Sequence, residues 1–497
     1  MNLMEENMRK SGILFPVSSI PSKYGIGTFG KKAYEFIDLL KKSGQSYWQI
    51  LPLGPTGYGD SPYQSFSTFA GNPYYIDLEL LIDEGLLTKE ECDKYDFGED
   101  DGYVDYEKVY NARFDVLRKA FRRFDADRDA YKAFVKKSEQ WLEDYALFMA
   151  IKNKYDGKSF AEWDEDIKTR QKAALKKYAK ECSEDVDFYK FQQFYFAKQW
   201  SELKEYANKN GVEIIGDIPI YVAFDSSDTW ANPELFQFDD KFQPIAVAGC
   251  PPDAFAKTGQ LWGNPLYNWE YHKETGYEWW MRRIAHCYEL YDVVRIDHFR
   301  GFDEYYSIPY GDPTAEFGKW MKGPGYDLFK VMKETLGKRK VIAEDLGFMT
   351  DTVIKLVKKT GFPGMKILQF AFDSREESDY LPHNYIQNNV VYTGTHDNDT
   401  IVGWWSACNR KDKAFAKKYL NIKSNKDIHK PFVRACLASV ADTVIIPMQD
   451  YLGLGSEARI NIPSTLGNNW KWRMKDGQFT DELAEEIYSW TKLYYRL

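Results

Sequence analysis

The feature that most constrains the fold is a series of short apolar runs, rich in β-branched and aromatic residues and bounded by turn residues. Such runs are typical of buried β-strands. They lie at residues 13–17, 47–53, 212–218, 292–296, 340–343, 365–370, 389–393 and 442–448. Amphipathic helical patterns separate most of them, at 31–43, 278–289, 326–336, 350–359 and 411–419. This alternation predicts an α/β fold, a parallel (β/α)8 TIM barrel, with a doubly wound sheet as the alternative.

The uneven spacing of these runs indicates insertions into a single catalytic barrel unit that spans residues 1–497. We expect residues 54–87 to form an insertion that shapes the cleft. Residues 88–208 contain long, charged, amphipathic patterns, which predict a helical insertion with solvated charged faces. Residues 223–276 are rich in Pro, Asp, Gly and Trp and have little periodicity. Loops of that length in compact domains are usually functional, so we expect an active-site lid there.

Composition argues against several classes of function. The chain has 66 Lys and Arg against 75 Asp and Glu, a net charge of −9, whereas a nucleic-acid binder needs a basic face. It lacks the run of about 18 apolar residues that a membrane span requires. Acidic residues near the N-terminus stand where a signal peptide would be apolar. We therefore expect a cytoplasmic protein with no nucleic-acid or membrane partner.

The cysteine and histidine patterns predict no metal and no cofactor. Six cysteines are scattered without a C-x-x-C spacing, which is typical of reduced and mostly buried thiols. The six histidines form no zinc-binding motif. Aromatic residues make up 17% of the chain, and this abundance suits sugar binding because a pyranose face packs on an aromatic ring.

The sharpest functional signal is a set of carboxylates placed directly after apolar runs: Asp217, Asp297, Glu344 and Asp397. A single such residue is usually a helix cap or half of a salt bridge. Four of them at the carboxyl ends of barrel strands, where barrel enzymes place their chemistry, indicate catalysis.

Glycosyl transfer needs clustered carboxylates without a metal. One carboxylate attacks the anomeric carbon, a protonated one donates to the leaving oxygen, and a third steadies the cationic transition state. Arg295 shares a strand face with Asp297 and would keep it ionised, as a nucleophile requires. The pKa of Glu344 should be raised by nearby anions, so that it can act as an acid.

The chain resembles the 4-α-glucanotransferases of glycoside hydrolase family 77, the amylomaltases or disproportionating enzymes. The resemblance runs from the string LFPVSSIPS, which begins at Leu14, to NWKWR at 469–473. It includes long specific strings: LPLGPTGYGDSPYQSFS from Leu51, GDIPIYV from Gly216, PPDAF from Pro251 and QLWGNP from Gln260. It implies a barrel with inserted subdomains and a retaining double-displacement mechanism.

By position in these motifs, the resemblance implies that Asp297 is the nucleophile, Glu344 the acid/base and Asp397 the transition-state stabiliser. It implies that Arg295, His396, Tyr63 and Asp217 contact the reacting sugar, with Tyr63 as a stacking platform. The implied lid residues are Asp253, Phe255, Gln260 and Trp262. His298 is a further candidate for sugar binding, and Tyr58 matches a second glucan site outside the cleft.

We therefore predict an enzyme that transfers α-1,4-glucan segments between maltooligosaccharides or starch-like glucans. The donor is a maltooligosaccharide, amylose, starch or glycogen, and the acceptor is glucose or another maltooligosaccharide. An α-glucan hydrolase with the same three carboxylates is the main alternative, and a starch-binding protein without catalysis is a second. Residues 25–30 match G-x-G-x-x-G, but the next predicted strand lacks the acidic residue of a dinucleotide site. We interpret this stretch as a glycine-rich turn at the cleft edge.

Overall fold

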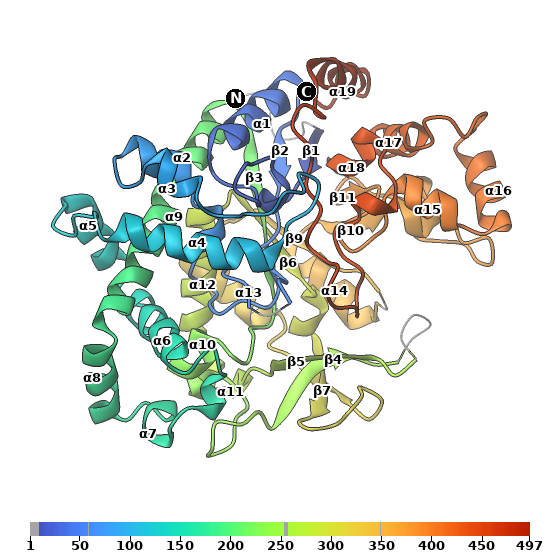
Figure 1. Ribbon diagram of the computed structural model, residues 1–497. Coiled ribbons are helices and arrows are strands. Elements are labelled where there is room, and N and C mark those ends of the chain that lie inside the picture. Colours follow the sequence, from blue (N-terminus) through green and yellow to red (C-terminus); the bar gives the residue numbers. More distant parts are fainter. Residues whose placement is uncertain (1–8, 58, 253–256, 348) are drawn as a thin grey trace.

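In the computed structural model, which describes residues 9–57, 59–252, 257–347 and 349–497, eight parallel strands of the described chain close into a barrel (Figure 1). In spatial order they run β1, β12, β11, β10, β9, β6, β3 and β2. Their bounds are β1 Lys10–Leu14, β2 Tyr47–Gln49, β3 Glu213–Pro219, β6 Val293–Asp297, β9 Val341–Ala343, β10 Gly364–Ile367, β11 Asn389–Tyr392 and β12 Thr443–Pro447. Each predicted run overlaps one of these strands, so the barrel prediction is confirmed.

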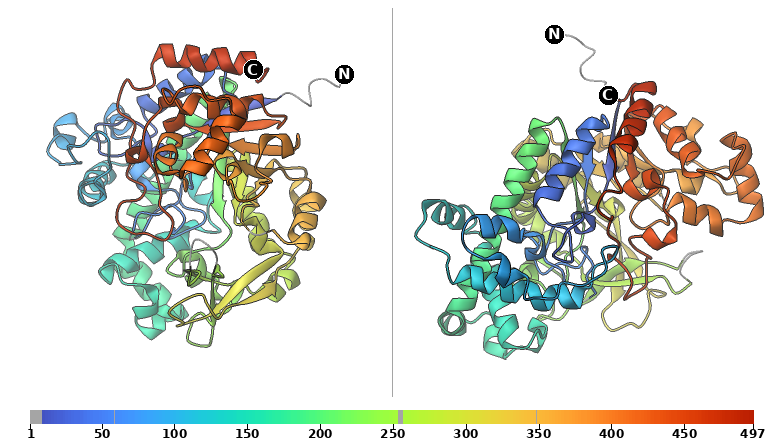
Figure 2. Two further views of the ribbon diagram at one scale, coloured as in Figure 1. Left: turned by 90° about the vertical axis from the view of Figure 1, so that its right-hand side faces the viewer. Right: turned by 45° about the horizontal axis from the view of Figure 1, so that its top comes forward.

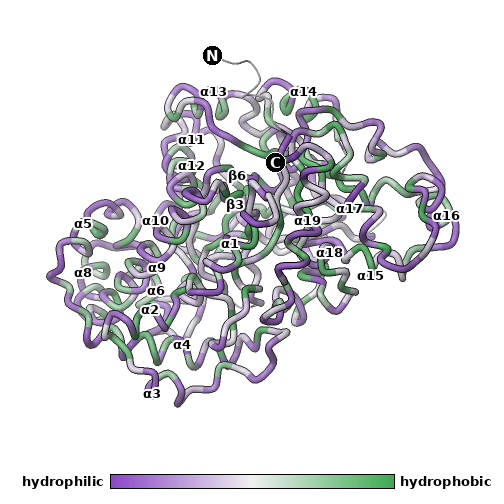
Figure 3. The backbone as a smooth tube through the Cα atoms, turned by 90° about the horizontal axis from the view of Figure 1, so that it is seen from above, coloured by the Kyte–Doolittle hydropathy of each residue, from purple (hydrophilic) through white to green (hydrophobic). Residues whose placement is uncertain are grey.

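Helices pack around the barrel through one apolar face each. In α1 (Lys31–Lys42) the buried residues Ala33, Phe36, Ile37 and Leu40 follow the spacing of a single helical stripe. The C-terminal helix α19 (Asp481–Leu493) packs against α1. The other helices of this group are α12 Glu278–Leu290, α13 Tyr326–Leu336, α14 Asp351–Thr360, α15 Ile401–Ala407, α16 Arg410–Tyr419, α17 His429–Ala438 and α18 Met448–Leu452. Seen from above, hydrophilic stretches dominate the outer turns of these helices (Figure 3).

The chain between β2 and β3 forms a helical region beside the barrel, on the left in Figure 1. Phe148 and Trp163 of this region form a small core together with Trp230, which lies after β3. The long helix α9 ties it to the barrel, because Trp200 donates its indole N–H to the carbonyl oxygen of Leu290 over 3.0 Å. Its helices are α2 Leu78–Asp83, α3 Lys89–Cys92, α4 Tyr106–Phe121, α5 Asp129–Lys137, α6 Leu142–Lys154, α7 Glu165–Lys168, α8 Lys172–Glu181 and α9 Ser183–Lys209.

Residues 223–276 contain more regular structure than their sequence indicates. They form α10 (Ser227–Ala231), β4 (Ala246–Cys250), β5 (Gln260–Pro265) and α11 (Trp269–Glu274). In the described chain, β4 and β5 join β7 (Glu304–Pro309) and β8 (Lys319–Lys322) in an antiparallel sheet ordered β5, β4, β7, β8. Figure 1 shows this sheet below the barrel, and Figure 2 shows it from two further sides. Four of the five residues of β4 are buried, whereas all four residues of β8, at the edge of the sheet, are exposed.

The glycine-rich stretch 25–30 serves packing. Gly25 has a φ of +77°, and a Cβ on Gly30 would lie 2.1 Å from Oδ2 of Asp77. Asp77 accepts the Thr28 hydroxyl over 2.6 Å and caps α2 by accepting the amide of Leu80. Glycine is thus required where this turn passes the cap. In the part of the chain that the structure describes, no helix has the length and apolar character needed to cross a membrane.

Candidate active site

Strand register brings three of the predicted carboxylates to the same end of the barrel. Asp217 on β3 is paired in register with Arg295 on β6, and Pro219 is paired with Asp297 at the end of that strand. Ile296 of β6 pairs with Ala343 of β9, so Asp297 and Glu344 follow at neighbouring positions. Adjacent strands lie about 4.8 Å apart, which places these two side chains beside each other at the barrel mouth.

Arg295 connects two of the carboxylates. Its Nη1 donates to both oxygens of the buried Asp217 over 2.7 Å, and its Nη2 lies 3.0 Å from Oδ1 of Asp297. Burial alone would lower the pKa of Arg295, but Asp217 and Asp297 outweigh it and hold this pKa above its ordinary value. The guanidinium therefore stays charged and forms ion pairs with both Asp217 and Asp297. This is the arrangement that the two-residue spacing predicts.

Glu344 is held by two backbone amides. His298 N–H donates to Oε2 over 2.7 Å, and Leu346 N–H donates to Oε1 over 2.8 Å. His298 reaches this position because it has left-handed backbone angles, with a φ of 51°, directly after β6. Each carboxyl oxygen has two lone-pair sites, so one site on each remains available for a proton.

The pKa of Glu344 is raised to about 7. Burial is the main cause and the neighbouring charge of Asp297 is the second, while Arg295 and the two amide hydrogen bonds oppose them. Glu344 is thus protonated in a substantial fraction of molecules at neutral pH, whereas Asp297 lies in an ion pair. Two carboxyl groups with separate environments can serve as an acid and a nucleophile.

Asp397 lies across from this pair in the segment that follows β11. Its Oδ1 accepts the Asn461 side-chain amide over 2.6 Å and lies 3.4 Å from Nε2 of His396. Asn461 also donates its backbone N–H to the carbonyl oxygen of His396, and Arg459 donates to the carbonyl oxygen of Asp397. Two adjacent residues are therefore fixed by one distant loop. The side chain of Asp397 is 45% exposed, so it can face a ligand.

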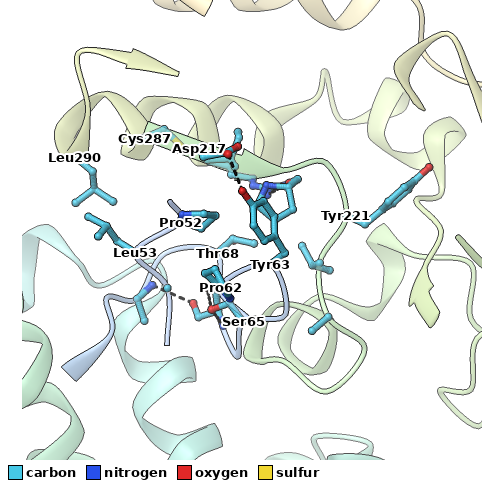
Figure 4. A pocket seen from close by; sticks show the side chains of 18 of the residues that line it. Pro52, Leu53, Pro62, Tyr63, Ser65, Thr68, Asp217, Tyr221, Cys287 and Leu290 are labelled. Carbon is cyan, nitrogen blue, oxygen red and sulfur yellow. Dashed lines mark hydrogen bonds between the residues drawn. The ribbon is translucent and has the colours of Figure 1, made fainter. Parts of the chain in front are cut away.

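Tyr63 joins the two sides of the site. Its hydroxyl donates to Oδ2 of Asp217 over 2.8 Å, and Figure 4 shows this bond in the pocket that both residues line. Its ring stacks on His396, with centroids 5.1 Å apart and planes 16° apart. The pKa of Tyr63 is raised by burial first, and Asp217, Asp297 and Asp397 raise it further. Tyr63 therefore contacts Asp217 through its hydroxyl and His396, the neighbour of Asp397, through its ring. The roles assigned to these carboxylates stay predictions.

Trp262 and His298 lie in contact on another side of the candidate active site. Their rings meet edge to face with centroids 4.8 Å apart, and the Trp262 indole donates to Oε1 of Gln260 over 3.1 Å. His298 Nε2 is buried without a hydrogen-bond partner among the described residues, so it has a free position for a ligand hydroxyl. Burial lowers the pKa of His298 to about 4, and the ring is therefore neutral. Three predicted site residues, Tyr58, Asp253 and Phe255, lie outside the described residues.

The structure adds contacts that sequence reasoning did not single out. Asn461 orients Asp397, and Trp470 lies 5.8 Å from the Tyr63 ring and 5.9 Å from the His396 ring, measured between centroids. Tyr221 flanks Trp262 at 6.2 Å. Tyr221 and Trp470 lie in the GDIPIYV and NWKWR strings, which carried the resemblance but gave these two residues no role. Asn461 lies in no such string. Over the described chain, no three His, Cys, Asp or Glu side chains are grouped so that they could hold a metal ion.

Comparisons with known proteins agree on one family. Residues 15–480 match a family described as 4-alpha-glucanotransferase. The chain is 52% identical over 483 residues to the 4-alpha-glucanotransferase of Clostridium butyricum, covering 97% of this chain and 99% of that protein. It is 44% identical over 501 residues to the 4-alpha-glucanotransferase of Thermus thermophilus, covering 98% and 99%. The solved amylomaltase from Streptococcus agalactiae, in complex with acarbose, matches with a TM-score of 0.96 and 44% identity over 98% of this chain and 99% of that one.

Proposed function

Because this chain belongs to the 4-alpha-glucanotransferases of glycoside hydrolase family 77, we propose that it transfers α-1,4-glucan segments by double displacement through a covalent glycosyl-enzyme. The donors are maltooligosaccharides or starch-like glucans, and the acceptors are glucose or other maltooligosaccharides. The observation that carries the mechanism is the pairing of Arg295-bound Asp297 with Glu344, whose pKa is raised to about 7. The cytoplasmic location stays a prediction.

In the first step, an Asp297 oxygen attacks the anomeric carbon of the donor, and the glycosidic C–O bond breaks. The bonding electrons leave with the glycosidic oxygen, which takes the proton of Glu344. Arg295 holds Asp297 in an ion pair and so positions it for this attack. Asp397, exposed toward the ligand and held by Asn461, stabilises the positive charge that develops on the ring.

In the second step, Glu344 is ionised and takes the proton of the acceptor 4-hydroxyl. The acceptor oxygen attacks the anomeric carbon, the bond to Asp297 breaks, and both carboxyl groups return to their starting states. Water in place of the acceptor gives hydrolysis. Aromatic rings at the mouth, among them Tyr63, Trp262 and Trp470, supply flat apolar surfaces on which sugar rings can stack.

Incubation with pure maltotriose tests the proposed activity. Transfer predicts glucose together with a ladder of longer maltooligosaccharides, separated by chromatography. An α-glucan hydrolase with the same three carboxylates would only shorten the substrate, and a glucan-binding protein without catalysis would leave it intact. Either of these two results would overturn the proposal.

The pH dependence of the first step is expected to follow the ionisation of Glu344. This step needs the protonated acid, so kcat/KM for maltotriose should fall as pH rises through about 7, by about tenfold for each further pH unit. The measurement is a pH profile of kcat/KM from about pH 5 to about pH 9. Residual activity of Glu344→Gln should lack this decline. A wild-type profile that is flat or rises through pH 7 contradicts the assignment.

Replacing Trp262 with Ala is expected to raise the share of hydrolysis more than it lowers total cleavage. Trp262 covers the His298 side of the site, and its removal admits water to the glycosyl-enzyme. The ratio of new reducing ends to longer products from maltotriose measures this share. Trp320→Ala is a matched control, because Trp320 lies in the same sheet on β8 and is 37% exposed. A lower hydrolysis share in Trp262→Ala would refute the water-exclusion role.

A further inference from the structure

A second cavity lies outside the active site, between helices α5 and α9 of the helical region at the left of Figure 1 and the barrel helix α12. Its volume is about 680 Å³, within the range of pockets that hold small organic ligands. Helix α5 lines it with Ala130, Ala133, Phe134 and Lys137, which follow the spacing of one helical face. Because the two alanines have small side chains, this face of α5 leaves space between itself and the opposite wall.

The charge of this cavity is opposite to that of the whole chain, which carries −9. Four cationic side chains line it: Arg128, Lys137, Lys198 and Arg282. Lys137 pairs with Glu289 at 2.9 Å. Arg128 and Lys198 share the single carboxylate of Glu84, at 3.7 and 2.5 Å. Two carboxylates thus face four cations.

Arg282 is the cation without a counterion. No described residue forms an ion pair or a hydrogen bond with the Arg282 side chain. Its Nε is buried without a partner. A buried N–H group without a hydrogen-bond acceptor costs free energy unless a ligand satisfies it. Arginine presents a planar fork of N–H groups that matches the oxygens of a phosphate or carboxylate.

The remaining walls suit a ring that carries hydroxyl groups. Trp141 and Phe69 lie parallel, with centroids 6.3 Å apart and planes 15° apart, and Phe134 lines the same cavity. Ser138 and Gln140 add polar side chains next to Trp141. Aromatic faces beside polar groups are the surroundings that a sugar ring prefers.

We propose that this cavity is a second ligand site that takes a phosphorylated sugar, with the phosphate on Arg282 and the sugar ring against the aromatic wall. A phosphate monoester carries nearly two negative charges, which matches the excess of two cations. The site is separate from the candidate active site and does not depend on the proposed transfer mechanism.

The cavity lies next to the pocket that Tyr63 and Asp217 line, and Leu290 lines both. Phe69 and Gly71 line the second cavity, whereas Ser67, Thr68 and Ala70 line the pocket that contains Tyr63. The Phe69 carbonyl oxygen is held by Nε2 of His286 at 2.8 Å, on the α12 side. A ligand in the cavity therefore presses on the loop that carries Tyr63, and its occupancy should change the KM for maltotriose.

Isothermal titration calorimetry with glucose 1-phosphate tests this site in the full-length protein. We expect saturable binding that Arg282→Met weakens at least about tenfold, since the variant loses a charge-assisted hydrogen bond to the phosphate. Ala133→Trp, at an exposed position on the rim, should block binding by filling the cavity. Arg410→Met, an exposed arginine at the start of α16, should bind as the wild type does. Thermal unfolding checks that each variant is folded.

Two other ligands and one other variant distinguish binding in this cavity from binding through the anion alone, through the sugar alone or at the active site. Inorganic phosphate should compete weakly, and maltose, which lacks the anion, should not compete. The Trp262→Ala variant, altered in the active site, should keep its affinity for glucose 1-phosphate. Unchanged affinity in both Arg282→Met and Ala133→Trp, or loss of binding only in Trp262→Ala, would overturn the proposed site. Saturating glucose 1-phosphate that leaves the KM for maltotriose unchanged would overturn the coupling to Tyr63.

Discussion

Replacing Asp297 with Asn is expected to abolish transfer and hydrolysis together, lowering kcat/KM for maltotriose by a factor on the order of 10⁴ or more. A neutral amide cannot form the ester to the anomeric carbon, so neither half of the double displacement proceeds. The fold should survive, because Arg295 keeps both contacts to Asp217 when it loses the 3.0 Å pair with Asp297. The measurements are initial rates with maltotriose and the midpoint of thermal unfolding.

Asp292→Asn is the matched control for this variant. Asp292 stands just before the same strand, at the opposite end of the barrel, where it accepts the backbone N–H of Ile214 over 2.8 Å. Its replacement should leave the rates near those of the wild type. Longer maltooligosaccharides formed at the wild-type rate by Asp297→Asn would refute the nucleophile assignment.

The second large effect is expected for Glu344→Gln, which should lower the rate with maltotriose by about 10²–10⁴-fold. Both steps move a proton through this carboxyl group, and an amide neither donates that proton nor accepts it. Glu334→Gln, an exposed position on α13 that lies 4.0 Å from Lys330, is a control of the same chemistry. Unchanged rates in Glu344→Gln would refute the assignment of Glu344 as the acid and base.

The leaving group distinguishes loss of the acid from damage to the site. Fluoride departs without a proton, so Glu344→Gln should keep a much larger fraction of its first-step rate with maltosyl fluoride than with maltotriose. Asp297→Asn should lose the first step with both donors. An equal loss of Glu344→Gln on both donors would point to a distorted site instead of a missing proton.

The barrel and its carboxylates could be predicted from the sequence because both depend on local patterns. Each barrel strand is a short apolar run, and Asp217, Asp297 and Glu344 each lie at or directly after one. Once the strands are parallel and adjacent, register alone brings these side chains together. Arg295 could be placed beside Asp297 because side chains two residues apart share a strand face.

The small sheet could not be predicted, because its strands are short and pair across intervening segments. β4 pairs with β7, which follows β6 in the chain. Gly249 of β4 must be a glycine, because a Cβ at this position would lie 2.1 Å from the carbonyl oxygen of Gln260. The exposed β8 shows no alternation of buried and exposed residues. Such strands lack the period-two pattern on which sequence analysis depends.

The orientation of the Asp397 side chain could not be predicted from the sequence either. It depends on Asn461, which lies 64 residues further along the chain and shares no motif with it. Residues 25–30 show the opposite case, in which a motif is present without the site it usually marks. Their G-x-G-x-x-G spacing matches a dinucleotide-binding motif, but in the structure it allows close packing against Asp77. A spacing pattern therefore predicts a site only where the surrounding elements also fit.

Intact-protein mass spectrometry of Glu344→Gln treated with maltosyl fluoride tests the central claim most directly. The first step forms the bond to Asp297 without an acid, and the second stalls because no base activates the acceptor. The account predicts a stable mass increase of one maltosyl unit, located by peptide mapping on Asp297, and no increase in the variant that also carries Asp297→Asn. An adduct on another residue, or rapid turnover of maltosyl fluoride by the double variant, would contradict it.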